Sequence, residues 1–211
     1  MKWLARIAVV SAMCVLVGGC SGTRYMREKM YGPLTASKPC CSSFHEFNYA
    51  PLPQGKLEFE ILTTDPTYNF ETGKSFFKPF LLPERTQPQI VKISSFSNSL
   101  VGGFFQPDIL ILDREKNITQ RIASPLVGQP LQRRPFMSAI LSNEFELPAD
   151  NARYAYLIVR TTDELLALRI PEQGTATLVA GNIYVPIVTH GFIVSWPAGE
   201  LALELRAAGA K

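Results

Sequence analysis

The fold class is decided by one stretch of the sequence, Phe105-Gln106-Pro107-Asp108-Ile109-Leu110-Ile111-Leu112-Asp113. It contains four consecutive aliphatic residues, with a proline before them and an aspartate after them. A short apolar run between such breaking residues is typical of a buried strand, and isoleucine is enriched in strands. Because four residues are too few for a helix of useful length, we predict a central strand here, with further strands arranged around it.

Segments on both sides of this stretch also have the alternating or apolar pattern of strands. They are residues 57–61, 75–82, 89–95, 118–122, 143–147, 154–160, 183–188, 192–194 and 201–205. Residues 136–141 are predicted to form a helical turn, and Thr161 with Glu164 fits the capping box of a second short helix. We therefore predict a mainly β fold, an antiparallel β-sandwich (jelly-roll-like) with one or two short helices.

Composition and charge narrow the class of protein. Of the 211 residues, 46% are hydrophobic and 18% are charged, which is ordinary for a globular protein. A domain of this size buries roughly 70% of its unfolded surface, so it needs no disulfide or metal ion to stabilise its fold. The formal net charge is only +3, and no basic run with interleaved aromatic residues is present. We therefore expect no nucleic-acid partner.

The N-terminus has the organisation of an export signal. Lys2 and Arg6 form a positive region, residues 7–17 form an apolar region, and small residues follow at positions 18 and 19. A spanning helix needs about 20 apolar residues, so this apolar region is too short to be one. Residues 1–19 are therefore predicted to be a signal peptide.

The end of that signal, Leu16-Val17-Gly18-Gly19-Cys20, resembles the lipobox of bacterial lipoproteins. The resemblance implies that Cys20 is lipidated and becomes the first mature residue. Ser21 stands where Gram-negative lipoproteins retained at the inner membrane usually have aspartate, which points to the outer membrane. Attached acyl chains supply membrane affinity of roughly 0.8 kcal/mol per buried CH₂. The alternative is a plain secretory signal with an incidental cysteine.

Residues 20–54 are predicted to be a lipidated tether that leads into a β-sandwich domain at 55–211. The aromatic segment 44–49 within it is expected to pack the tether onto the sheet. Cys40 and Cys41 are adjacent, with Cα atoms about 3.8 Å apart, less than the usual disulfide span of about 4.4–6.8 Å. Thiols outside the cytoplasm tend to be oxidised. A strained bridge between the two, a link to a partner chain and two free thiols all remain open.

Three sequence blocks, in order, resemble the maltose operon periplasmic protein (MalM) family. The first is the stretch 105–113 and the second is Tyr156-Leu157-Ile158-Val159-Arg160-Thr161-Thr162. The third is Pro186-Ile187-Val188-Thr189-His190 with the closing strand at 199–205. The resemblance covers about residues 85–206. This chain has a lipobox where some members have an ordinary signal peptide.

The resemblance implies a function in carbohydrate uptake. Members are exported proteins associated with maltose and maltodextrin uptake, and no enzymatic activity is attached to the family. The protein is thus predicted to be a non-catalytic envelope lipoprotein, accessory to maltose/maltodextrin transport in the periplasm. Its expected contacts are the outer membrane, through lipid on Cys20, and maltodextrin or a transport component. The alternative is a structural or protein-binding outer-membrane lipoprotein with no sugar role.

Few residues offer catalytic chemistry. Asp108 and Asp113 flank one strand at a spacing that puts them on opposite faces, which disfavours hydrolysis by paired carboxylates. The two histidines, His45 and His190, are expected to have structural roles. The sequence has no nucleophile elbow, phosphate loop or His-Glu-x-x-His motif. We therefore predict no catalytic residue, no cofactor and no metal.

Aromatic residues are the remaining candidates for sugar contact. Trp196, Tyr184, Tyr154 and Phe104 could each stack on a sugar ring. Sheet cores use aromatic side chains routinely, so core packing is the simpler interpretation for any one of them. The sequence does not rank the four.

Labelling with radioactive palmitate tests the lipid attachment. The wild-type protein and a Cys40→Ala control should incorporate label, and Cys20→Ala should incorporate none. Unlabelled wild-type protein, or equal label in Cys20→Ala, would contradict lipidation at this residue.

Overall fold

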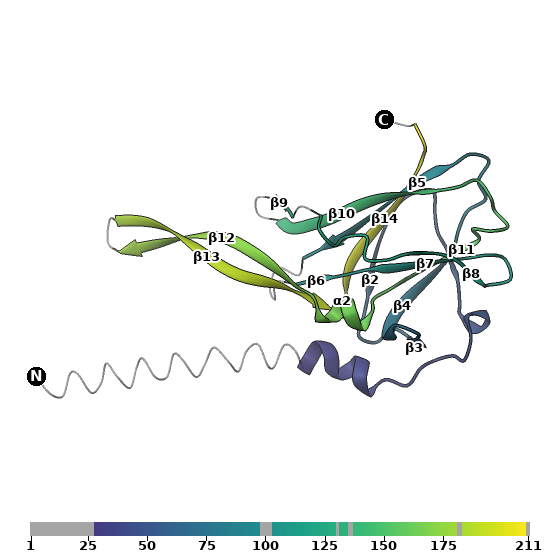
Figure 1. Ribbon diagram of the computed structural model, residues 1–211, viewed down its shortest axis with the longest axis horizontal. Coiled ribbons are helices and arrows are strands. Elements are labelled where there is room, and N and C mark those ends of the chain that lie inside the picture. The colour runs from purple at the N-terminus through teal and green to yellow at the C-terminus, as the bar shows by residue number, and fades with distance from the viewer. Residues whose placement is uncertain (1–27, 98–102, 130, 135–136, 181–182, 210–211) are drawn as a thin grey trace, which may run out of the picture.

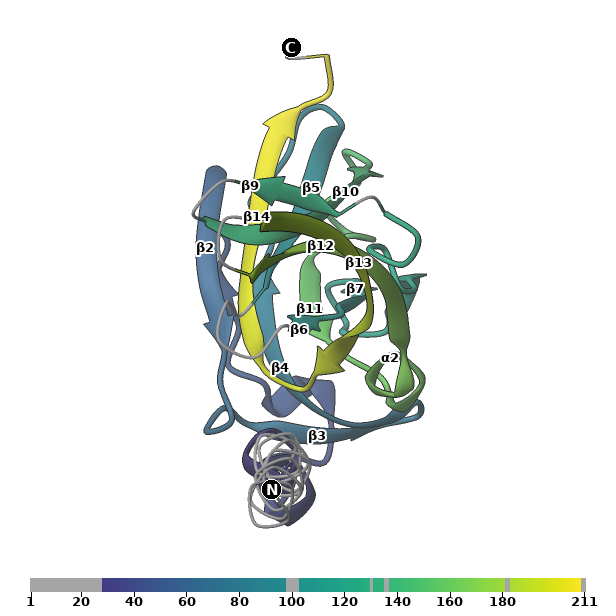
Figure 2. The same ribbon diagram turned by 90° about the vertical axis from the view of Figure 1, so that its left-hand side faces the viewer.

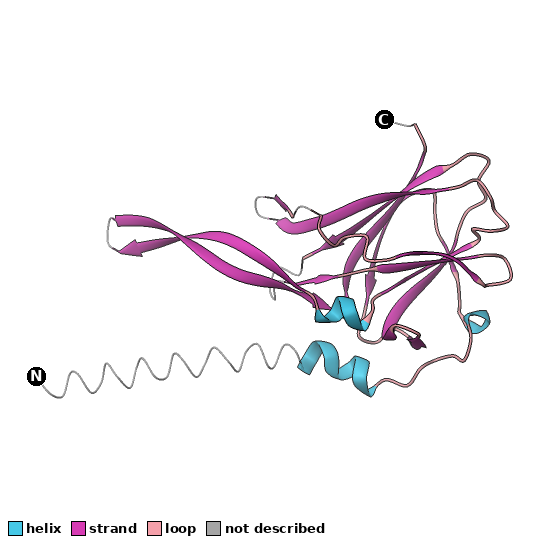
Figure 3. Cartoon of the chain, in the orientation of Figure 1, coloured by secondary structure: helices cyan, strands magenta, loops and turns pink. Residues whose placement is uncertain are grey.

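The computed structural model describes residues 28–97, 103–129, 131–134, 137–180 and 183–209 (Figure 1). The predicted signal peptide and Cys20 lie outside these residues. Within the described ranges, no helix is both long and apolar enough to cross a bilayer. The chain is built mainly from strands, with short helices at its margins (Figure 3). The prediction of a mainly β fold is confirmed.

A six-stranded sheet contains the stretch that we expected to be a central strand. Its order is β1-β4-β11-β7-β8, with β3 paired to β4. The strands are β1 (Ala50–Pro51), β3 (Thr67–Phe70), β4 (Gly73–Leu81), β7 (Asp108–Leu112), β8 (Ile118–Ile122) and β11 (Tyr156–Arg160). All five residues of β7 are buried, and β7 pairs antiparallel with both β11 and β8. The predicted buried strand is therefore confirmed.

A five-stranded antiparallel sheet faces the first one. Its order is β2-β14-β5-β10-β9. The strands are β2 (Gly55–Ile61), β5 (Gln89–Phe96), β9 (Gln132–Arg134), β10 (Met137–Leu147) and β14 (Gly199–Ala207). Ile109 and Ile111 of β7 belong to one buried cluster with Ile93 of β5 and Leu203 of β14. This cluster forms the core between the two sheets, as a β-sandwich requires.

The predicted helical turn at 136–141 is wrong. Its described residues, 137–141, belong to β10. Residues 140–147 of β10 pair continuously with β5, from Ile140 opposite Phe96 to Leu147 opposite Gln89. This pairing satisfies the backbone hydrogen-bonding groups along the whole segment. Tertiary context therefore overrides the local preference for a helical turn.

A long two-stranded arm extends from the body (Figure 1), and Figure 2 looks along this arm toward the body. It consists of β12 (Arg169–Ala180) and β13 (Ile183–Trp196), which pair antiparallel without a register shift. The last three residues of β13 also pair in parallel with β6 (Gly103–Phe105). The sequence analysis predicted two short strands where β13 is continuous, and it did not predict β12.

Residues 28–36 are helical, and two shorter helical elements follow, η1 (Phe44–Glu46) and α2 (Asp163–Ala167). The cap of α2 is Thr162, whose hydroxyl accepts from the Leu165 N–H at 3.2 Å. The predicted capping box placed this cap one residue early. Thr161 is instead buried, and its N–H donates to the Ser75 hydroxyl at 3.0 Å.

The N-terminal segment 28–54 lies along the six-stranded sheet. The Cys40 N–H donates to the Thr67 carbonyl and the Leu52 N–H to the Leu81 carbonyl, both at 2.8 Å. Phe47 is buried and stacks on Phe77 of β4 with ring centroids 4.2 Å apart. From residue 28 onward, the segment that we expected to lead into the domain is thus packed against it. The packing agrees with the role predicted for the aromatic segment 44–49.

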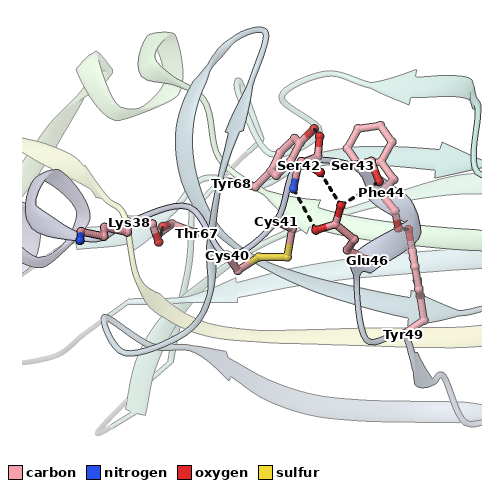
Figure 4. Close-up of a disulfide and its surroundings, with 10 residues drawn as sticks. All are labelled: Lys38, Cys40, Cys41, Ser42, Ser43, Phe44, Glu46, Tyr49, Thr67 and Tyr68. Atoms are coloured by element: carbon pink, nitrogen blue, oxygen red, sulfur yellow. Dashed lines mark hydrogen bonds between the residues drawn. A yellow bond between two sulfur atoms is a disulfide. The ribbon is translucent and has the colours of Figure 1, made fainter.

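Cys40 and Cys41 form a disulfide with each other, and their Cα atoms are 3.7 Å apart (Figure 4). Of the three alternatives left open by the sequence, the structure has the bridge between neighbours. Glu46 lies beside it and accepts from the hydroxyl and the N–H of Ser42. These hydrogen bonds lower the pKa of the Glu46 carboxyl below its usual value.

Replacing Phe47 by alanine tests whether segment 28–54 covers the sheet. We expect Phe47→Ala to lower the free energy of unfolding by about 3–5 kcal/mol, because a buried ring is lost. The exposed neighbour His45 provides the control, and His45→Ala should change stability by less than about 0.5 kcal/mol. Urea unfolding measures both values. Equal stability of the two variants would show that the segment does not pack as described.

Candidate functional site

A pocket of about 220 Å³ lies where the ends of β2, β5 and β13 meet β6 and the start of β14. Its wall also includes part of the helical segment 28–36. Its lining includes Met30, Glu60, Phe105, Trp196 and Glu200. Phe105 and Trp196 are buried and form its floor, whereas Glu60 and Glu200 are exposed and lie at its rim.

Trp196 is the central residue of the pocket. It is the last residue of β13 and pairs with Phe105 of β6. The side chain is 7% exposed, and its indole Nε1 has no hydrogen-bond partner among the described residues. An N–H that is buried without a partner costs free energy, and here the atom is enclosed against Gly103, so the ring offers the pocket apolar surface and not a donor.

Glycine is required where Trp196 meets β6. A Cβ atom built on Gly103 would lie 1.8 Å from Nε1 of Trp196, a distance that no real contact has. On the other side of the pocket, a Cβ on Gly199 would lie 3.0 Å from the Cβ of Phe105. The close approach of the two aromatic residues to the backbone therefore depends on these glycines.

The helical segment closes one side of the pocket. Met30 lines it, and the neighbouring Tyr31 has its ring centroid 5.9 Å from that of Trp196. The Tyr31 hydroxyl lies 2.7 Å from the Ser195 carbonyl and 3.2 Å from the Leu166 carbonyl, and it donates to these acceptors. These contacts tie the segment that follows the predicted lipid anchor to the end of β13.

Two carboxylates face each other at the rim. Glu60 of β2 and Glu200 of β14 are register partners on adjacent antiparallel strands, so they lie on the same face. Both are exposed, and neither forms an ion pair within the part of the chain that the structure describes. Like charges directly opposite each other weaken a sheet, so a ligand that donates hydrogen bonds to both would be favoured.

This arrangement suits binding more than catalysis. An apolar aromatic floor accommodates the C–H face of a small molecule, and rim carboxylates accept hydrogen bonds from its hydroxyl groups. Among the described residues, no group of three or more His, Cys, Asp or Glu side chains could hold a metal ion. The pocket is therefore a candidate site for a small polyhydroxylated ligand.

The two carboxylates of the central strand, Asp108 and Asp113, have structural partners away from the pocket. Asp108 is fully buried; its Oδ2 lies 2.7 Å from Nη2 of Arg160, and its Oδ1 lies 2.9 Å from Nε of Arg121. Arg160 is 3% exposed, and this burial lowers the pKa of its guanidinium, while Asp108 opposes the shift. Asp113 lies in the following turn and accepts from the Asn117 N–H at 2.8 Å.

The remaining candidates from the sequence lie apart from one another. His45 is exposed in η1, while His190 and Tyr184 lie in β13 opposite Gln173 and Val179. Phe104 is buried in the core, and Tyr154 packs against the same core from its margin.

Of the four aromatic candidates, Trp196 lines the pocket, together with two glutamates that the sequence analysis did not single out. Glu60 and Glu200 are far apart in the sequence, and only the strand register brings them together. The alternation of 57–61 predicted the strand on which Glu60 lies exposed, but it gave no indication that Glu200 would be its neighbour.

Fold and pocket together define a β-sandwich protein with a small ligand-sized cavity. A family model described as "Maltose operon periplasmic protein precursor (MalM)" matches residues 72–205, more than half of the chain. The chain belongs to this family, which confirms the resemblance seen in the sequence. Membership supports a periplasmic role linked to the maltose system. No curated protein matches the chain at a significant level.

Neutralising the buried aspartate tests its structural role. Asp108→Asn should lower the free energy of unfolding by about 3–5 kcal/mol, because it leaves the buried Arg160 charge without a counter-charge. Asp113→Asn, in the exposed turn, should cost less than about 1 kcal/mol. Urea unfolding of the two variants measures the difference. Equal stabilities would contradict a structural role for the Asp108–Arg160 pair.

Proposed function

We propose that this protein is a non-catalytic envelope lipoprotein, accessory to maltose or maltodextrin uptake, that holds the end of a sugar chain in the pocket at Trp196. The observation that carries the proposal is an aromatic floor with two rim carboxylates that form no ion pair among the described residues, in a member of the MalM family. The lipobox resemblance ending at Cys20 supports attachment to the outer membrane.

The size of the pocket selects the part of the sugar that it holds. Its volume of about 220 Å³ lies below the roughly 300–1,000 Å³ typical of drug-sized sites. A cavity of this size suits one hexose unit better than a whole oligosaccharide. The rest of a maltodextrin chain would extend past Glu60 and Glu200, which are exposed to solvent.

Hydrogen bonding distinguishes a sugar from a purely apolar ligand. Sugar hydroxyls donate to carboxylate oxygens, and hydrogen bonds to charged groups contribute about 1.5–3 kcal/mol each. Trp196 and Phe105 supply the apolar surface on which the C–H groups of a sugar ring can pack. A sugar ring can therefore pack its C–H groups on the aromatic floor and donate hydrogen bonds from its hydroxyl groups to the rim carboxylates.

The position of the pocket fits a membrane-attached protein. Seven residues separate Cys20 from residue 28, and such a segment spans at most about 25 Å when fully extended. Helical residues 28–36 also form part of the pocket wall. Lipid on Cys20 would thus hold the pocket close to the membrane surface, within reach of a transport component.

A structural or protein-binding outer-membrane lipoprotein without a sugar role is the second candidate. The observation that favours it is the projecting β12–β13 arm, because an extended ribbon is suited to contact with another protein (Figure 1). This function needs neither the pocket nor its carboxylates.

Calorimetric titration with maltose and maltoheptaose separates the two candidate functions. The mature protein is titrated in a detergent that has no sugar head group. We expect heat with both sugars and a loss of affinity of about 10-fold or more in Glu60→Gln/Glu200→Gln, from the weakened charged hydrogen bonds. The matched control is Glu58→Gln on the same strand, which should bind like wild type.

Two outcomes would contradict the proposal. No heat at millimolar sugar would remove direct sugar binding and leave the second candidate. Binding that Glu60→Gln/Glu200→Gln leaves unchanged would place the sugar outside this pocket.

A further inference from the structure

The arm formed by β12 and β13 leaves one of its edges without a partner. β13 pairs with β12 along residues 183–194 and with β6 at residues 194–196. β12 is the terminal strand of this sheet, so its outer edge has no partner strand among the described residues. A free edge exposes a row of backbone donors and acceptors that can pair with another strand.

Two prolines identify which backbone groups point outward. Pro171 of β12 lies opposite Phe192, and Pro186 of β13 lies opposite Thr177. A proline has no N–H to give to the facing strand, so both pairs are of the non-hydrogen-bonded kind. On β12 the two pairs lie at residues 171 and 177, an even number of residues apart. Because the two kinds of pair alternate along the ladder, both assignments agree with an uninterrupted ladder.

The same alternation shows that the two edges of the arm differ. In non-hydrogen-bonded pairs the N–H and C=O groups point away from the facing strand. On β12 these are residues 173, 175, 177 and 179, and none of them is proline. On β13 the corresponding row is interrupted at Pro186, and proline is a common protection of a sheet edge.

Charge does not protect the β12 edge either. The sequence has no Asp, Glu, Lys or Arg between Glu172 and Glu200, a range that includes all of β12 beyond its first four residues. Natural edge strands are usually blocked by charged residues, prolines or bulges. The segment 173–180 has none of these three protections.

We propose that the outer edge of β12, residues 173–180, pairs antiparallel with the same edge of a second copy of this chain. The two arms then form a continuous four-stranded sheet around a two-fold axis. This satisfies the outward N–H and C=O groups of both copies. It also supports a ribbon that, with two strands alone, would be marginally stable in water.

Symmetry and charge favour a second copy over a different partner. An antiparallel pair of identical strands is self-complementary, as a two-fold dimer interface must be. A charged edge placed against itself would set like charges opposite each other, which destabilises strand pairs. Because 173–180 carries no charge, that penalty is absent. The inference is independent of sugar binding.

A proline substitution tests the edge while leaving the arm intact. Thr177→Pro removes one outward N–H and none of the bonds between β12 and β13. We expect wild-type mature protein, measured by light scattering with the detergent contribution subtracted, to have twice the monomer mass. Thr177→Pro should have half the wild-type mass, and the control Thr177→Ala should keep it.

Cysteine scanning locates the axis of the proposed dimer. Single cysteines placed in turn at each position from 173 to 180 should cross-link between copies most strongly at the position nearest the two-fold axis. The near-ultraviolet circular dichroism of Thr177→Pro should match that of Thr177→Ala, which shows that the body remains folded.

Three results would overturn the proposal. A monomeric wild-type protein at its highest soluble concentration would exclude self-pairing. A dimer that persists unchanged in Thr177→Pro would place the contact away from the β12 edge. Absence of cross-links at every position from 173 to 180 in a dimeric protein would exclude antiparallel β12 pairing.

Discussion

The structure depends on the burial of β7 on both of its faces. Ile109 and Ile111 pack into the core between the two sheets, while Leu110 and Leu112 belong to a second cluster on the opposite face. A strand with no wet face needs cover on both sides. One cover is the five-stranded sheet, and the other is the aromatic segment that includes Phe47.

This requirement explains why the N-terminal segment is part of the fold. Without Phe47 and its neighbours, the outer face of β4, β11 and β7 would expose a continuous apolar surface to water. The segment is held by backbone bonds to Thr67 and Leu81, at the ends of the region that it covers. As a consequence, the folded body begins at or before residue 28, which seven residues separate from Cys20 in the sequence, and the pocket at Trp196 lies beside the helical segment 28–36.

Local patterns in the sequence predicted the strands but not the relations between them. The run 105–113 predicted β7, and the alternation of 57–61 predicted β2, because burial and wet faces follow from nearby residues. These local patterns could not predict which segments, distant in the sequence, pair as neighbouring strands. The pairing of β10 with β5 replaced an expected helical turn, and the register of β2 with β14 created the Glu60–Glu200 pair. The sequence analysis also missed β12, which has one strand partner and lies in the arm that projects from the body (Figure 1).

Hydrogen exchange at two backbone amides tests the central claim most directly, namely that segment 28–54 is a fixed cover of the sheet. The amides are those of Cys40 and Leu52, which donate to Thr67 and Leu81 across the boundary between segment and sheet. The account predicts that both exchange slowly, at rates close to those of the amides within β4. Exchange of both at the rate of an unstructured chain, with β4 still protected, would contradict it.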